Sequence, residues 1–123
     1  MTLVDTSVWV DFFRGRPVAR PLVPLLETGE VLLHPWVYGE LSLGTLGRQR
    51  SALLGDLRLL PSGQILDENE ALAFIESQSL SGKGIGWVDA NLLGSCLRAE
   101  ATLWTHDRAL HRLATSLKIA FKP

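Results

Sequence analysis

Four acidic residues stand where carboxylates could converge on one site. Asp5 follows the apolar stretch TLV, Glu40 lies in VYGELSLG, Asp89 follows GKGIGWV, and Asp107 follows LWTH. Taken singly, acids at helix starts are usually caps or partners of the helix dipole. The strongly apolar residues before Asp5, Asp89 and Asp107 instead indicate carboxylates held in place for a chemical purpose.

Carboxylates that converge need a cation between them. Two of them about 5 Å apart repel by roughly 3 kcal/mol at an effective dielectric near 20, and four make several such pairs. Oxygen ligands alone favour Mg²⁺, with Mn²⁺ as a substitute, over zinc. His106 and His111 lie off a common helical face, and the single cysteine, Cys96, falls in an apolar helical pattern that predicts burial. We therefore expect surface or core roles for all three histidines and no zinc site.

Strands that alternate with helices must position these acids. The pattern predicts strands at 2–5, 30–34, 102–105 and 118–121, and helices that begin near residues 6, 21, 35, 48, 67, 87 and 107. Asp67 and Glu70 form a capping-box pair at one of these helix starts. Such alternation predicts an α/β fold with a parallel sheet. Ligand sites in these sheets lie beyond the carboxyl ends of the strands. Three of the four acids fall at such strand ends. Glu40 follows its strand by about one and a half helical turns, which is short enough to place it at the same edge of the sheet.

Composition bounds the class of protein. The chain of 123 residues has room for one domain, and a hydrophobic content of 46% with a mean hydropathy of +0.17 fits a compact, ordered fold. Twelve Lys and Arg against thirteen Asp and Glu leave it without the bulk basicity that often marks nucleic-acid binding. The apolar runs are short and no signal sequence is evident, so we expect a soluble cytoplasmic protein without a membrane partner.

Four segments together carry a resemblance to a known family. These segments are LVDTSVWVDFF, VYGELSLG, GKGIGWVDANLL and LWTHDRALHRLA. In their order and spacing the chain is similar to the PIN-domain ribonucleases, and most closely to the VapC-type toxins of prokaryotic toxin–antitoxin modules. The similarity covers nearly the whole chain and implies a single PIN-like domain over 1–123, a central, mainly parallel sheet flanked by helices. By position it makes Asp5, Glu40, Asp89 and Asp107 the catalytic and metal-binding acids.

The resemblance also implies an activity and partners. It implies a Mg²⁺-dependent endoribonuclease that cleaves structured RNA to a 5′ phosphate and a 3′ hydroxyl, a homodimer, and inhibition by a VapB-type antitoxin. Thr6 and Thr105 match small hydroxyl residues beside the metal or its water. Arginine side chains are candidate phosphate contacts, with plain solvated helix faces as the alternative, at Arg14, Arg16, Arg108 and Arg112.

Other interpretations remain open at this point. The main alternative is a catalytically inactive PIN-like module that binds RNA or protein. Asp5 could also be the nucleophile of a phosphotransfer domain, although the second Asp and the Lys that it needs are not evident. The stretch SGKGIG is not a nucleotide-binding loop, because Gly84 follows Lys83 where Ser or Thr is required. Finally, Trp9, Trp36 and residues 22–26 offer more apolar surface than a small core absorbs, which predicts a dimer or antitoxin interface.

Overall fold

A computed structural model describes all 123 residues and contains a three-stranded parallel sheet. The strands are β1 (Thr2–Val4), β2 (Val31–Leu32) and β3 (Thr102–Trp104), in the order β2-β1-β3. Leu3 of the central strand lies opposite Leu32 on one side and Leu103 on the other. The predicted parallel sheet flanked by helices is confirmed.

The sheet is shorter at its edges than the sequence predicts. The expected strand at 30–34 contains only Val31–Leu32, and the expected strand at 118–121 is a single bridge between Ala120 and Leu103. A similar bridge pairs Leu33 with Ser62 at the opposite edge. Each of these outer segments therefore pairs with the sheet at a single position.

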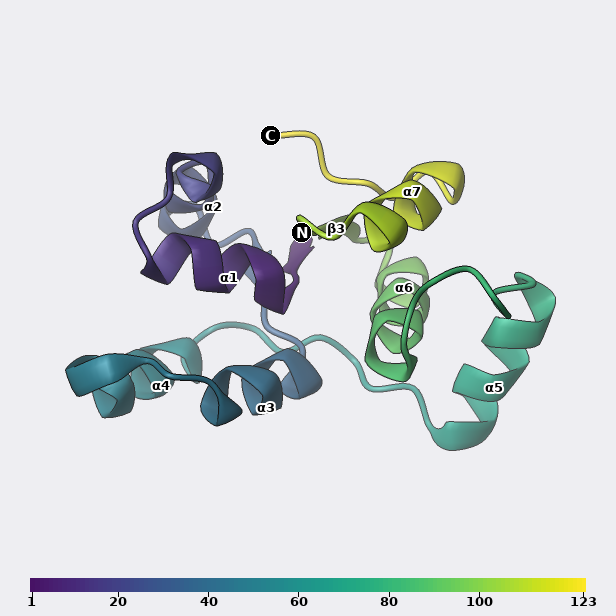
Figure 1. Cartoon of the computed structure of the whole chain (residues 1–123), viewed down its shortest axis with the longest axis horizontal. Helices are drawn as coiled ribbons and strands as arrows, with labels where there is room; N and C mark the ends of the chain where they lie inside the picture. The colour runs from purple at the N-terminus through teal and green to yellow at the C-terminus, as the bar shows by residue number, and fades with distance from the viewer.

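Seven helices surround the strands (Figure 1). Figure 1 shows α1 to α4 on one side of β3 and α5 to α7 on the other. Their bounds are α1 (Thr6–Phe13), α2 (Leu22–Glu27), α3 (Pro35–Leu43), α4 (Arg50–Leu57), α5 (Glu68–Ser77), α6 (Trp87–Ala99) and α7 (Arg108–Ser116). Each predicted helix is present, and the capping box of Asp67 and Glu70 is confirmed at the start of α5. None of the helices is both long and apolar enough to cross a membrane.

The core absorbs more of the apolar surface than the sequence suggests. Trp9 is 1% exposed and stacks on Phe13, with ring centroids 5.7 Å apart, and Leu22 is fully buried. The prediction of exposed apolar surface is therefore wrong for Trp9 and Leu22, which lie in the core, and confirmed for Val23, which is 42% exposed. Leu43 and Leu59 are instead the most exposed large apolar side chains.

Two further predictions about single side chains are confirmed. Cys96 is buried in α6, and this burial raises the pKa of its thiol to about 12. His34 is a fully buried core histidine whose Nδ1 accepts a hydrogen bond from the Trp36 amide at the start of α3. Burial lowers the pKa of His34 to about 4, so its ring is neutral near pH 7.

Candidate active site

Asp5 lies at the centre of the predicted site and is 6% exposed. It begins α1, yet its side chain makes no cap hydrogen bond to that helix. Its Oδ2 instead accepts hydrogen bonds from Ser7 Oγ at 2.8 Å and from Thr105 Oγ1 at 2.7 Å. The Asp5 amide also donates to the Trp104 carbonyl, which fixes the end of β1 against the end of β3. The carboxylate is thus held by a hydroxyl of α1 and a hydroxyl that follows β3, and it does not cap the amides of α1.

Two backbone amides orient these hydroxyls. The His106 amide donates to Ser7 Oγ at 3.0 Å, and the Asp107 amide donates to Thr105 Oγ1 at 3.1 Å. A hydroxyl has one proton to donate, and each oxygen here already accepts from an amide, so both protons are directed to Asp5. The bonds converge on Oδ2 and leave Oδ1 for solvent or a cation. The partners of Asp5 are hydroxyls and not a lysine, so the phosphotransfer interpretation gains no support.

Asp89 is electrostatically coupled to the other three predicted acids. Asp89 lies in the first turn of α6, where its Oδ2 accepts a hydrogen bond from the Gly86 amide at 3.3 Å. Its pKa is raised, first by burial and then by the charges of Asp5, Asp107 and Glu40, while the Gly86 amide lowers it. The structure therefore brings all four predicted acids to the same edge of the sheet.

Glu40 and Asp107 are the exposed members of this group. Glu40 Oε1 accepts a hydrogen bond of 2.6 Å from Thr6 Oγ1, which links α3 to the first residue of α1. Asp107 is the N-cap of α7, and its Oδ2 accepts from the Leu110 amide at 2.8 Å. The two predicted supporting threonines therefore bind different acids: Thr6 donates a hydrogen bond to Glu40, and Thr105 donates one to Asp5.

The oxygen atoms at this edge suit a hard divalent cation. The donor set consists of carboxylates, with one Asp5 oxygen free of protein hydrogen bonds and with mutual repulsion that a cation would relieve. No three His, Cys, Asp or Glu side chains stand close enough together to form a ready-made ligand cluster. The carboxylates share an edge without meeting at one point.

A second polar cluster, which was not predicted from the sequence, lies beside the acids. Asp11 of α1 accepts from His106 Nδ1 at 2.6 Å on one oxygen and from Arg16 at 2.9 Å on the other. Because a carboxylate only accepts, the His106 Nδ1 carries the hydrogen. This cluster ties α1 to the segment whose amides orient the hydroxyls. Asp11 follows Ser7 by four residues, so helical spacing was the available signal; nothing local indicated His106.

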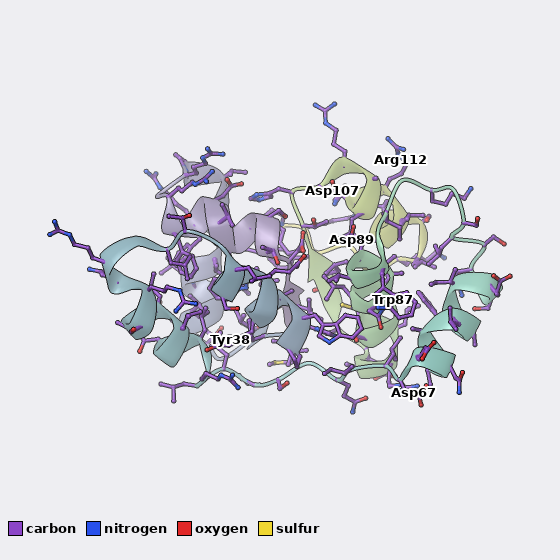
Figure 2. The ribbon with its side chains drawn as sticks, turned by 60° about the horizontal axis from the view of Figure 1, so that its bottom comes forward. Tyr38, Asp67, Trp87, Asp89, Asp107 and Arg112 are labelled. Atoms are coloured by element: carbon purple, nitrogen blue, oxygen red, sulfur yellow. The ribbon has the colours of Figure 1, made fainter.

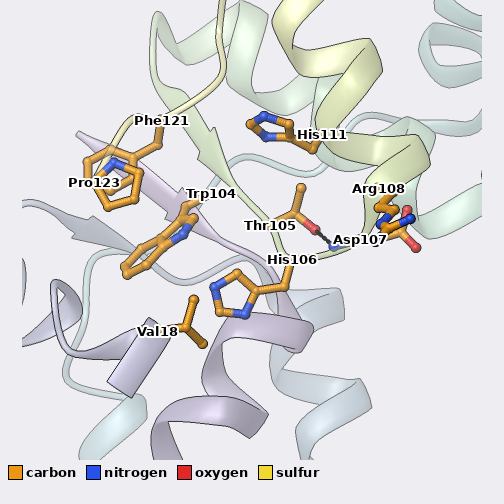
Figure 3. A pocket seen from close by; sticks show the side chains of 9 residues that line it. All are labelled: Val18, Trp104, Thr105, His106, Asp107, Arg108, His111, Phe121 and Pro123. Atoms are coloured by element: carbon orange, nitrogen blue, oxygen red, sulfur yellow. Dashed lines mark hydrogen bonds between the residues drawn. The ribbon is translucent and has the colours of Figure 1, made fainter. Parts of the chain in front are cut away.

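The four predicted arginine contacts have different surroundings. Arg16 is paired with Asp11, whereas the exposed Arg14, Arg108 and Arg112 form no ion pair in the structure. Arg108 lines a hollow of about 270 Å³ beside Asp107 (Figure 3). The other side chains around this hollow include Trp104, His106, His111 and Phe121.

Comparison with known proteins identifies the family of the chain. The sequence profile of the PIN domain matches residues 2–116. The chain belongs to the PIN domain family. It is 42% identical over 111 residues to Ribonuclease VapC32 of Mycobacterium tuberculosis, an alignment that covers 89% of this chain and 87% of the relative.

Solved structures of other PIN proteins share this fold. A chain of a toxin–antitoxin complex from Klebsiella pneumoniae superposes with a TM-score of 0.68 at 19% identity, over 87% of each chain. A chain of the FitAcB crystal structure from Neisseria gonorrhoeae gives a TM-score of 0.63 at 20% identity, over 98% of this chain and 95% of that one. At such identities these neighbours support the PIN fold alone.

Proposed function

We propose that this PIN-domain protein is a metal-dependent endoribonuclease and the toxin of a type II toxin–antitoxin module. One observation carries the proposal: Ser7 and Thr105 hold the Asp5 carboxylate by one oxygen and leave the other free, at the edge of the sheet where Asp107 also lies. The hydrogen bond that Thr6 donates to Glu40, and the charges that add to burial in raising the pKa of Asp89, link the other two acids to this edge. The relative that shares 42% of its residues over most of both chains is a ribonuclease, which supports the same activity.

Asp5 and Asp89 are the residues that would hold Mg²⁺, with Mn²⁺ as a substitute. When bound, the ion supplies positive charge to the scissile phosphate. Ser7 and Thr105 keep the Asp5 carboxylate fixed, so that its free oxygen does not have to be reoriented during the reaction. This preorganisation explains why Asp5 gives up its cap hydrogen bond.

Glu40 and Asp107 are placed to orient water or to help hold a second ion. Both are exposed, as groups that handle solvent must be, and each is itself held by a hydrogen bond, from Thr6 and from the Leu110 amide. A water molecule would displace the 3′ oxygen in line and leave a 5′ phosphate and a 3′ hydroxyl. The exposed arginines beside this edge, Arg108 and Arg112, would contact phosphates of a structured RNA.

We propose an antitoxin partner and a homodimer as the setting in which the protein acts. A VapB-type antitoxin would cover the acidic edge with its C-terminal segment, and the protein would act in the cytoplasm as a homodimer. The neighbour from Klebsiella pneumoniae is itself described as part of a toxin–antitoxin complex. Exposed apolar side chains such as Leu43 and Val23 provide surface for these contacts.

The test is cleavage of total cellular RNA by purified protein with Mg²⁺, with EDTA, and with Asp5→Asn. The amide keeps an oxygen that can accept from Ser7 and Thr105 but loses the charge, so we expect the fold to remain and cleavage to disappear. Asp56→Asn, an exposed change in α4, is the matched control and should cleave normally. Normal cleavage by a folded Asp5→Asn variant would refute the site. No cleavage by the unmodified protein, folded and free of antitoxin, would favour a module that only binds.

A further inference from the structure

Two tryptophan side chains meet beside the acidic edge. Trp36 lies in the first turn of α3 and Trp87 is the first residue of α6. Their ring centroids are 6.3 Å apart and their planes differ by 31°. Trp87 is 43% exposed, whereas the other two tryptophans, Trp9 and Trp104, are buried. The accessible indole surface of the protein is therefore gathered at this pair.

Each member of the pair comes from a helix that also carries one of the four acids. Trp36 precedes Glu40 by four residues, so the two share a face of α3. Trp87 precedes Asp89 by two residues, and both lie in the first turn of α6 (Figure 2). Because the rings of Trp36 and Trp87 lie 6.3 Å apart, the starts of α3 and α6 face each other. The indole pair thus lies beside the acidic edge, next to Glu40.

A cationic side chain is available at the same edge. Arg108 begins α7 directly after Asp107, and it is exposed and forms no ion pair. The loop that leads into α6 packs against this helix start, where a side chain at Gly84 would come within 3.6 Å of Ala109. A nucleotide chain across the acids would thus meet a cation for its phosphates and aromatic rings for a base.

We propose that Trp36 and Trp87 form a stacking site for one unpaired nucleobase of the RNA, next to the phosphodiester at the acids. This inference rests on the proposed nuclease function. A lone exposed apolar residue such as Leu59 needs no explanation, but paired aromatic rings beside a phosphate-processing site match the surfaces on which bases stack. Stacking contributes about 1–3 kcal/mol per base and tolerates any sequence. It also gives a chain of net charge −1 a way to bind RNA that does not depend on bulk basicity.

The experiment measures binding without cleavage. A short oligoadenylate is titrated into the protein in EDTA while tryptophan fluorescence is recorded, and an abasic oligomer of the same length serves as the ligand control. Because Trp9 and Trp104 are buried, quenching by a base reports on Trp36 and Trp87. We expect quenching by oligoadenylate and little by the abasic oligomer. Trp87→Ala should raise the dissociation constant by roughly 5- to 100-fold, and Trp87→Phe should keep most of the affinity.

Leu59→Ala is the matched control, because it removes an exposed apolar side chain of the segment after α4. It should bind like the unmodified protein. Equal binding of oligoadenylate by Trp87→Ala, equal binding of the abasic oligomer, or no quenching at all would overturn the stacking site. If Trp87→Ala instead weakens only the binding of an apolar peptide, the pair belongs to a protein interface.

Cleavage of total RNA with Mg²⁺, measured in parallel, separates the two proposals. Cleavage together with unchanged binding by Trp87→Ala overturns the stacking site alone. Base-dependent quenching without cleavage overturns the nuclease and leaves a base-binding protein.

Discussion

Replacing Thr105 by Val should weaken the hold on Asp5 while nearly preserving the shape of the side chain. The change removes the 2.7 Å hydrogen bond to Asp5 Oδ2 and leaves the Asp107 amide without its acceptor. Hydrogen bonds to charged groups contribute about 1.5–3 kcal/mol. If the fixed carboxylate is what the reaction uses, a loss of this size slows cleavage by about 10- to 100-fold.

The assay is the initial rate of cleavage of a fluorogenic RNA with Mg²⁺, with urea unfolding followed in parallel. Thr102→Val is a matched control on the same strand, since Thr102 pairs its hydroxyl with that of Thr2 at 3.0 Å, at the end of β3 away from the acids. This neutral pair contributes about 0.5–1.5 kcal/mol, so the control should lose stability but not rate. An unchanged rate for Thr105→Val, or equal slowing by both variants, would refute the reasoning.

Two further predictions concern pH and salt. The pKa of His34 is about 4 in the folded protein and about 6.5 in the unfolded chain. Between pH 6.5 and pH 4 the unfolded chain therefore binds more protons than the folded protein. The free energy of unfolding falls as the pH drops through that range. We expect about 2 kcal/mol less stability at pH 5 than at pH 7.5 in urea unfolding, and much less dependence in His34→Asn; a flat profile in the unmodified protein would contradict this. Removing both Arg108 and Arg112 should reduce the dependence of log K on log salt for single-stranded RNA by about 0.7 per lost phosphate contact. Arg98→Ala removes a cation already paired with Glu70 and is the control; an unchanged slope for the Arg108 and Arg112 variant would exclude phosphate contacts there.

The helices and the position of Asp5 could be predicted because their signals are local. Capping residues and apolar spacing predicted every helix start to within a few residues. The apolar residues before Asp5 predicted a carboxylate that is held for chemistry, and its side chain makes no cap hydrogen bond. Strand lengths at the edges were overestimated, since Ala120 pairs only once with Leu103. An apolar run indicates burial, but it does not show where the pairing stops.

The partners that hold the site could not be predicted, because they join segments far apart in the chain. No role in the site was predicted for Ser7, yet it donates to Asp5 and accepts from the His106 amide. His106 itself was assigned no role beyond a surface or core position, although it pairs with Asp11. Trp9 was expected to supply exposed apolar surface, but it is buried. The sequence does not reveal how much of the apolar face of a short helix the core will cover.

The joining of Asp5 to Thr105 has a consequence for synthesis of the chain. Asp5 precedes its second hydroxyl donor, Thr105, by 100 residues, and the neighbouring acid Asp107 follows two residues later. The central strand β1 likewise lacks its partner β3 until Trp104 has been added. A nascent or truncated chain that stops before residue 105 carries the first acid without one of the two hydroxyls that orient it. The site is therefore assembled only after the segment with Thr105 and Asp107 has been made and has folded against β1.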